Sequence, residues 1–266
     1  MSNSIFLLRS GAPAGLMEAA AMLITQATGG AITPVFVKVA ERNAVVVGVD
    51  PPSGAYASVV RPPDNPNPTY AGVQTVVVRS ILPREPPQHL QLRDILDVYL
   101  GSGIDGASEA KRAGSTFTKA AKLAVEFAKE QTASRLTLVI KTATKYENLN
   151  NVFVRCATEV AESAGLTTEV LHTAKAANEL VIFPEKYGVV LVNDNPICEN
   201  VQRAFAGVVG GAPEIFYLDG GDCISGGASY RSIALAVAQE LVSLGMPQEA
   251  EKVRAAAAKD TRKVVL

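Results

Sequence analysis

The chain has 266 residues, and its 25 basic and 26 acidic side chains give a formal net charge of −1. This balance argues against a protein that binds nucleic acid or an anionic membrane, because both kinds of partner need a basic surface. Hydrophobic residues make up 48% of the chain and charged residues 19%, so we expect a packed core and exclude global disorder. Tryptophan is absent, so that core must be mainly aliphatic.

The chain has too few cysteines and histidines to indicate a disulfide framework or a metal site built from these residues. Cys156, Cys198 and Cys223 are too few and too scattered for a disulfide framework or a zinc site. His89 and His172 are the only histidines, and neither sits in a motif that would indicate a catalytic triad or a metal centre. No apolar run reaches about 18 residues, so no transmembrane segment is expected.

The first third of the chain mixes short strands with proline-rich loops. Residues 1–10 allow a targeting segment, but the Gly-rich turn and the helix that follow favour a first strand. The segment from Pro51 to Pro87 is rich in proline and must consist largely of loops. The expected elements are a strand at 4–8, a helix at 16–28, strands at 32–39, 44–49 and 73–78, and a short helix or turn at 90–99.

From residue 107 onward, strands and helices alternate. The expected helices are 116–131, 151–164, 174–183, 196–209, 231–244 and 248–259, and the expected strands are 135–141, 167–171, 187–192 and 214–218. The strand at 187–192 is interpreted as entirely apolar, which is typical of a strand buried on both faces. The alternation predicts an α/β fold with substantial parallel sheet.

Several stretches follow one another in a recognisable order. An apolar strand, 136–141, ends in Lys141; a helix follows at 153–163; and 187–192 and 206–211 supply a strand and a glycine-terminated helix end. In this order the chain resembles the isocitrate/isopropylmalate dehydrogenase family, most closely the subunits of mitochondrial NAD-dependent isocitrate dehydrogenase. Segments 6–15 and 92–99 fit the family more weakly. The resemblance covers nearly the whole chain, in a degenerate and shortened form.

The resemblance implies a particular architecture. It implies an α/β fold with a two-part sheet and flanking helices, in which the small-domain clasp is reduced or absent. Residues 1–99 with 215–266 would form the large domain, and residues 100–214 the small, central domain. Family members dimerise through the helices that correspond to 151–164 and 197–209, so we expect these two helices to present an apolar face to other protein subunits.

The family's metal site is altered in this chain. Family members oxidise a metal-bound 2-hydroxy acid, and the ion needs oxygen ligands from aspartates. The ligand helix aligns with 197–203, where Glu199 takes the first acidic position and Arg203 the second, and the partner-subunit aspartate falls near Ala174. A guanidinium repels a dication, so no metal is expected. Arg203 would either contact a substrate or partner or, as we favour, pair with Glu199 one helical turn away.

The substrate and cofactor positions are altered as well. Arg93 alone remains of the substrate arginines, Lys141 remains of the catalytic pair, and the segment that carries the catalytic tyrosine is missing. The cofactor loop aligns with 219–223, where two carboxylates would repel a pyrophosphate; they are expected to cap the loop rather than to hold a cation. The degenerate cofactor positions are Asp219, Gly220, Gly221, Asp222 and Ser229.

The joint loss of metal, substrate and cofactor residues predicts a non-catalytic protein without a cofactor. The resemblance to mitochondrial subunits favours a structural or accessory subunit of a larger mitochondrial complex, in the matrix or on the matrix-facing side of an inner-membrane complex such as the ATP synthase or a respiratory complex. Two alternatives stay open. One is a regulatory subunit of a heteromeric NAD-dependent isocitrate dehydrogenase, and the other is an active NAD-dependent hydroxy-acid dehydrogenase.

Overall fold

The computed structural model describes residues 3–10, 14–37, 44–48, 51–63, 67–83, 106–142, 147–194, 196–219, 221–225 and 230–259. It is a mixed α/β structure, and its contacts divide it into two compact units. Unit 1 comprises Met1–Ser53 and Gly211–Leu266, and unit 2 comprises Gly54–Gly210.

Unit 1 is built on a mostly parallel set of strands in the order β2-β1-β3-β10-β9. β1 pairs in parallel with β2 and β3, β10 pairs in parallel with β3, and β9 is antiparallel to β10. The N-terminal segment is therefore a strand, as the sequence favoured. The bounds are β1 Asn3–Ser10, β2 Ile32–Val37, β3 Ala44–Gly48, β9 Glu214–Leu218 and β10 Gly221–Ser225.

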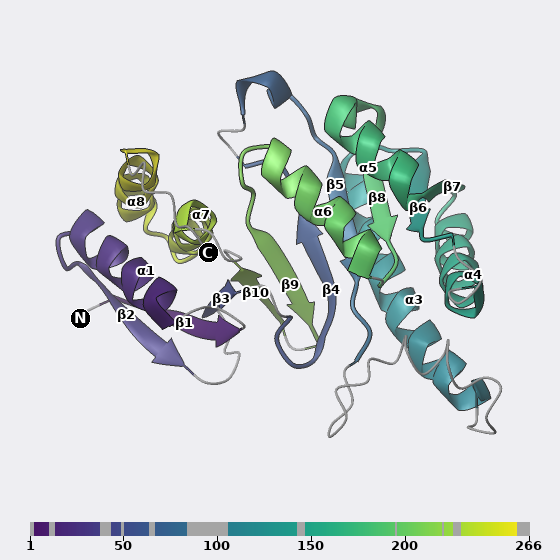
Figure 1. Cartoon of the computed structure of the whole chain (residues 1–266), viewed down its shortest axis with the longest axis horizontal. Coiled ribbons are helices and arrows are strands. Elements are labelled where there is room, and N and C mark those ends of the chain that lie inside the picture. The colour runs from purple at the N-terminus through teal and green to yellow at the C-terminus, as the bar shows by residue number, and fades with distance from the viewer. Residues whose placement is uncertain are drawn as a thin grey trace. The chain divides into compact units, whose positions relative to one another are not determined.

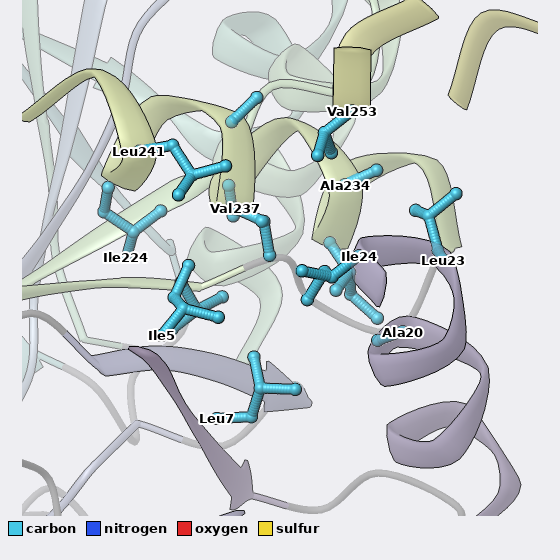
Figure 2. Packing of buried hydrophobic residues seen from close by; sticks show 14 of the residues in the cluster. Ile5, Leu7, Ala20, Leu23, Ile24, Ile224, Ala234, Val237, Leu241 and Val253 are labelled. Atoms are coloured by element: carbon cyan, nitrogen blue, oxygen red, sulfur yellow. The ribbon is translucent and has the colours of Figure 1, made fainter. Parts of the chain in front are cut away.

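Three helices pack together over this sheet: α1 (Ala14–Ala27), α7 (Tyr230–Ser243) and α8 (Pro247–Lys259). The core between them and the strands is aliphatic, as the absence of tryptophan predicted (Figure 2). Ile5 and Leu7 of β1 meet Ile24 of α1 and Val237 of α7, all buried (Figure 2). Packing between aliphatic side chains is thus the main cohesive force of unit 1.

Unit 2 has strands in the order β4-β5-β8-β6-β7. β5, β8, β6 and β7 are mutually parallel, whereas β4 is antiparallel to β5. All four residues of β8 are buried, which confirms the prediction of a central strand covered on both faces. The bounds are β4 Ala55–Val60, β5 Val76–Ser80, β6 Arg135–Ile140, β7 Thr167–His172 and β8 Val189–Val192.

Among the described elements, two helices lie on each face of this sheet (Figure 1). α3 (Gly106–Glu130) and α4 (Glu147–Ser163) pack together on one face, where the rings of Phe117 and Phe153 meet edge to face with centroids 5.2 Å apart. α5 (Thr173–Ile182) and α6 (Pro196–Val208) pack together on the other. The carboxyl ends of β5, β6 and β8 meet at one edge of the sheet, next to the first turn of α6.

The structure differs from the expected division in one region. Residues 54–83 were assigned with the N-terminal segment, but β4 and β5 belong to unit 2, because β5 pairs with β8 along its length. β4 and β10 were not expected, and α3 begins at Gly106, well before the expected start. The expected helix at 90–99 lies outside the described residues. None of the described helices combines the length and apolar composition needed to cross a bilayer.

Candidate functional site

The carboxyl edge of the unit 2 sheet contains the position that the sequence assigned to a metal ligand. Glu199, in the first turn of α6, contacts two guanidinium groups. Its Oε2 lies 3.0 Å from Nη1 of Arg79 on β5, and its Oε1 forms an ion pair with Nη2 of Arg203 one helical turn away. The helix-spaced pair that the sequence favoured is therefore present, together with a second partner that the sequence did not indicate.

Arg79 is the buried member of this cluster. Its side chain is 2% exposed, whereas that of Glu199 is 20% exposed and that of Arg203 44%. A buried guanidinium is stable only when its charge is paired and its N–H groups are bonded. Glu199 supplies the counter-charge, and Nε of Arg79 donates to the hydroxyl of Ser58 at 3.2 Å.

A glutamine on α6 extends this network to two strands. The Ser58 hydroxyl donates to Oε1 of Gln202 at 3.1 Å. The side-chain amide of Gln202 donates in turn to the carbonyl oxygens of Ser58 and Val77, at 3.1 and 3.0 Å. Ser58 and Gln202 are both buried, so these bonds satisfy polar groups that have lost water. The network fixes α6 against β4 and β5.

The charge of this cluster is opposite to that of a metal site. Two guanidinium groups and one carboxylate sum to +1, and both carboxylate oxygens are already occupied. A dication placed beside Glu199 would meet repulsion from Arg79 and Arg203. Ala174, in the first turn of α5, contributes no ligand. In the ranges that the structure describes, no group of three or more metal-ligating side chains is found.

Lys141 lies just beyond the end of β6, at the same edge of the sheet. Its carbonyl oxygen accepts a bond from the side-chain amide of Asn150 at 2.9 Å, and Asn150 accepts one from Asn193 at 3.0 Å. These bonds hold the main chain at the strand ends and do not involve the ammonium group. Oδ1 of Asn193 is buried and has no partner within the described residues.

An acid and a thiol, Asp194 and Cys198, also lie at this edge of the sheet. Oδ2 of Asp194 accepts the main-chain N–H of Leu82 at 2.8 Å, so this carboxylate anchors the chain that leaves β5. Burial, reinforced by the negative charge of Asp194, raises the pKa of Cys198 to about 12. A thiol must ionise to act as a nucleophile or ligand, and this shift disfavours ionisation of Cys198.

The segment that the sequence aligned with the family's cofactor loop lies in unit 1, where β9 is followed by β10. β9 and β10 pair antiparallel with Leu218 opposite Gly221 and Tyr217 opposite Asp222. Asp219 therefore begins a tight turn, and the Asp222 side chain is exposed on β10. This conformation differs from a loop that opens a helix towards a phosphate. Arg93, Gly220 and Ser229 lie outside the described residues.

The two helices expected to bind a partner differ in their exposed faces. On α4 the large apolar side chains are buried or half-buried, and the fully exposed positions are polar or charged. The apolar face expected for 151–164 is therefore not found, because that face is used against α3 and the sheet. α6 does expose apolar positions: Ile197 is 42% exposed, and Ala204 and Gly207 are exposed on the same helix.

Sequence reasoning missed Arg79, Ser58 and Gln202. Arg79 would have been marked only if the expected strand had extended beyond residue 78, because it is the only charged residue in the observed strand Val76–Ser80. A charge inside a strand that is otherwise buried needs a partner, and Glu199 is the acid that faces it. No local pattern marked Gln202, because its bonding partners lie far away in the sequence.

Comparison with known proteins gives structural neighbours only. No protein-family model matches the chain, and no curated protein matches it. A chain in the cryo-EM structure of the peripheral stalk of the Euglena gracilis mitochondrial ATP synthase matches with a TM-score of 0.69 at 16% identity, over 97% of this chain and 90% of that one.

Two crystal structures also match. The TT0538 protein of Thermus thermophilus has a TM-score of 0.58 at 15% identity, over 98% of this chain and 69% of that one. Isocitrate dehydrogenase of Methylococcus capsulatus has a TM-score of 0.57 at 14% identity, over 94% of this chain and 88% of that one. The fold of this chain is similar to that of isocitrate dehydrogenase. At these identities the similarity establishes the fold alone.

Proposed function

We propose that this chain is a pseudoenzyme: a non-catalytic protein with an isocitrate dehydrogenase-like fold that serves as a structural or accessory subunit of a larger complex. The single observation that carries the proposal is the reversed charge around Glu199. A hydroxy-acid dehydrogenase of this family needs a dication that holds the substrate and stabilises the developing negative charge. Arg79 and Arg203 contact both carboxylate oxygens of Glu199, and they place positive charge where such an ion would have to bind.

The proposal extends to the other degenerate positions. Lys141 and Arg93 are remnants of a catalytic and substrate-binding set, and Asp219, Gly220, Gly221, Asp222 and Ser229 are remnants of a cofactor loop. The hairpin that contains Asp219 and Gly221 supports this view, because it leads from one strand into another strand. The protein works without a metal ion or NAD. As in the family, the two chain ends would together form one domain and the central segment would form the other.

We propose the mitochondrion as the location, and the ATP synthase as the first assembly to test. The similarity to a peripheral-stalk chain supports both, since it extends over nearly the full length of the two chains. Within unit 2, the outer face of α6 is the better candidate contact surface. Ile197 offers an apolar anchor there, and the small side chains at Ala204 and Gly207 allow close approach of a partner.

This function is tested by identifying the complex with which the chain migrates in extracts of its own cell. The full chain, carrying an affinity tag, is expressed in its source organism and followed on native gels of a mild-detergent extract. The proposal predicts migration in a large band with ATP-hydrolysing activity. The variant Ala204→Arg should release the chain from that band, because it places a long charged side chain on the α6 face. Glu162→Arg, on the polar face of α4, should leave it in place.

Two results would count against the proposal. If both the untagged and the tagged chain migrated at the mass of the free protein, the chain would not be a subunit of a larger complex. Migration in a band that reduces NAD with isocitrate would favour a regulatory subunit of isocitrate dehydrogenase instead.

A further inference from the structure

A polar pocket of about 540 Å³ opens at the amino ends of the parallel strands of unit 2, at the opposite edge of the sheet from Glu199. It is bordered by the loop before β5, by the turn between α3 and β6, and by the segment that leads into β8. Its volume falls within the range of about 300–1,000 Å³ that is typical of small-molecule sites. None of the residues discussed above for the metal, substrate or cofactor lines it.

A buried hydroxyl forms part of its lining. Thr137 on β6 is 2% exposed, lies opposite Val190 on β8 and Glu169 on β7, and lines the pocket. A threonine hydroxyl can both donate and accept a hydrogen bond, so this group is suited to bond a molecule that enters the pocket.

The walls are held in place before any ligand arrives. Nε2 of Gln131 donates to the carbonyl of Gln74 at 2.6 Å across the rim. The hydroxyl of Thr75, behind the wall, bonds the carbonyl oxygens of Pro184 and Tyr187 at 2.5 and 2.6 Å. These bonds join three segments that are distant in sequence. A site whose walls are fixed loses less entropy when it binds a ligand.

The charged groups of the pocket define what it can hold. Arg135 and Lys186 line it with positive charge, and Glu185 adds one carboxylate. Nη1 of Arg135 pairs with Glu169 at 3.1 Å, but this pair is 48% and 35% exposed. An exposed pair of this kind contributes little, and the guanidinium keeps further N–H donors for an anion. The ammonium of Lys186 lies over the ring of Phe183, 4.0 Å from its centroid.

Acceptors and hydroxyl donors complete the set. Oε1 of Gln131 and the Glu185 carboxylate can accept bonds from ligand hydroxyls, whereas Thr137 and Ser134 can donate or accept. We propose that this pocket binds a small polyhydroxylated anion, a molecule with one anionic group and several hydroxyls. The anionic group bonds Arg135 and Lys186, and the hydroxyls bond Thr137, Gln131 and Glu185. The inference is independent of the proposed subunit role.

The anionic group can be a phosphate or a carboxylate. Four probes separate the contribution of the anionic group to binding from that of the hydroxyls. The full chain, labelled with ¹⁵N, is titrated at constant ionic strength with ribose 5-phosphate, gluconate, ribose and inorganic phosphate while amide shifts are recorded. We expect saturable shifts at 134–137 and 186–188 with at least one of the first two probes. Ribose and inorganic phosphate should bind about tenfold more weakly, a difference of about 1.4 kcal/mol. Whichever of the first two probes saturates identifies the anionic group.

Two variants test the assigned contacts. Arg135→Gln removes the guanidinium, and Thr137→Val removes the hydroxyl while keeping a β-branched side chain suited to the strand. Each should weaken binding of the polyhydroxylated anion about tenfold, whereas Arg155→Gln, exposed on α4, should not. The proposal is overturned if neither ribose 5-phosphate nor gluconate gives saturable shifts, if inorganic phosphate alone binds equally well, or if both pocket variants bind with unchanged affinity.

Discussion

The two units each contain a carboxyl group with little access to water, and they stabilise these groups in opposite ways. Glu199 of unit 2 lies between the guanidinium groups of Arg79 and Arg203. Glu240, on α7 of unit 1, is 5% exposed, and its Oε1 has no hydrogen-bond partner within the described residues. Burial, with a contribution from the negative charge of Asp222, raises the pKa of Glu240.

This contrast shows two ways in which a protein can remove a carboxylate from water. At Glu199, two guanidinium groups compensate for the water that the carboxylate has lost. Glu240 lowers the cost by holding its proton at a pH where an exposed glutamate would be ionised. Neither carboxylate is available to a metal ion, since the first is already paired and the second disfavours ionisation. Three substitutions test this comparison.

The largest effect is expected from Arg79→Met. The change removes the buried cation and the bonds that it makes with Glu199 and Ser58, and so disrupts the network that includes Gln202. The free energy of unfolding should therefore fall by about 3 kcal/mol. Urea unfolding of the full chain measures this value. The double variant Arg79→Met with Glu199→Gln should be more stable than the sum of the two single changes implies, by about 1–3 kcal/mol. A loss below about 1 kcal/mol for Arg79→Met would show that the network adds little.

A smaller effect, with a distinctive pH dependence, is expected from Glu240→Gln. The native state holds the Glu240 proton more tightly than the unfolded state does, so the stability of the protein should fall as pH rises above the usual glutamate pKa of 4.5. Glutamine cannot ionise and should remove this part of the slope, with a gain of about 1 kcal/mol at neutral pH. Urea unfolding from acidic to neutral pH measures the slope, and parallel curves for the two proteins would contradict the account.

The smallest effect is expected from Arg203→Ala. Arg203 contacts the same carboxylate as Arg79 but is half exposed, and exposed pairs one helical turn apart contribute about 0.3–0.5 kcal/mol. Added salt should reduce even this loss. If Arg203→Ala cost as much as Arg79→Met, the exposed guanidinium would be the main partner of Glu199, and burial would not explain the network.

Much of the fold could be predicted because its elements have strong local patterns. The expected strands at 135–141 and 187–192 and the expected helix at 196–209 agree with β6, β8 and α6 to within a few residues. Elements with weak patterns were missed. β4 lies in the proline-rich segment, where the prolines indicated loops, and β10 is a short strand that follows directly from a hairpin turn.

The site divides in the same way. The pair of Glu199 and Arg203 could be predicted, because both residues lie on one helix at a spacing that brings them together. The contact with Arg79 could not, since the expected strand ended at residue 78 and the partner lies on a distant segment. Burial of Arg79 follows from the parallel pairing of β5 with β8, which places it beside α6. Only the folded arrangement shows that two guanidinium groups contact the Glu199 carboxylate.

The most direct test of the central claim is a titration of the full chain with Mn²⁺ in the presence of isocitrate and NAD, followed by electron paramagnetic resonance of the free ion. Mn²⁺ favours the same oxygen ligands as Mg²⁺. The reversed charge around Glu199 predicts that no equivalent of Mn²⁺ is taken up. Uptake of one equivalent, abolished by Glu199→Gln and accompanied by reduction of NAD, would contradict the account.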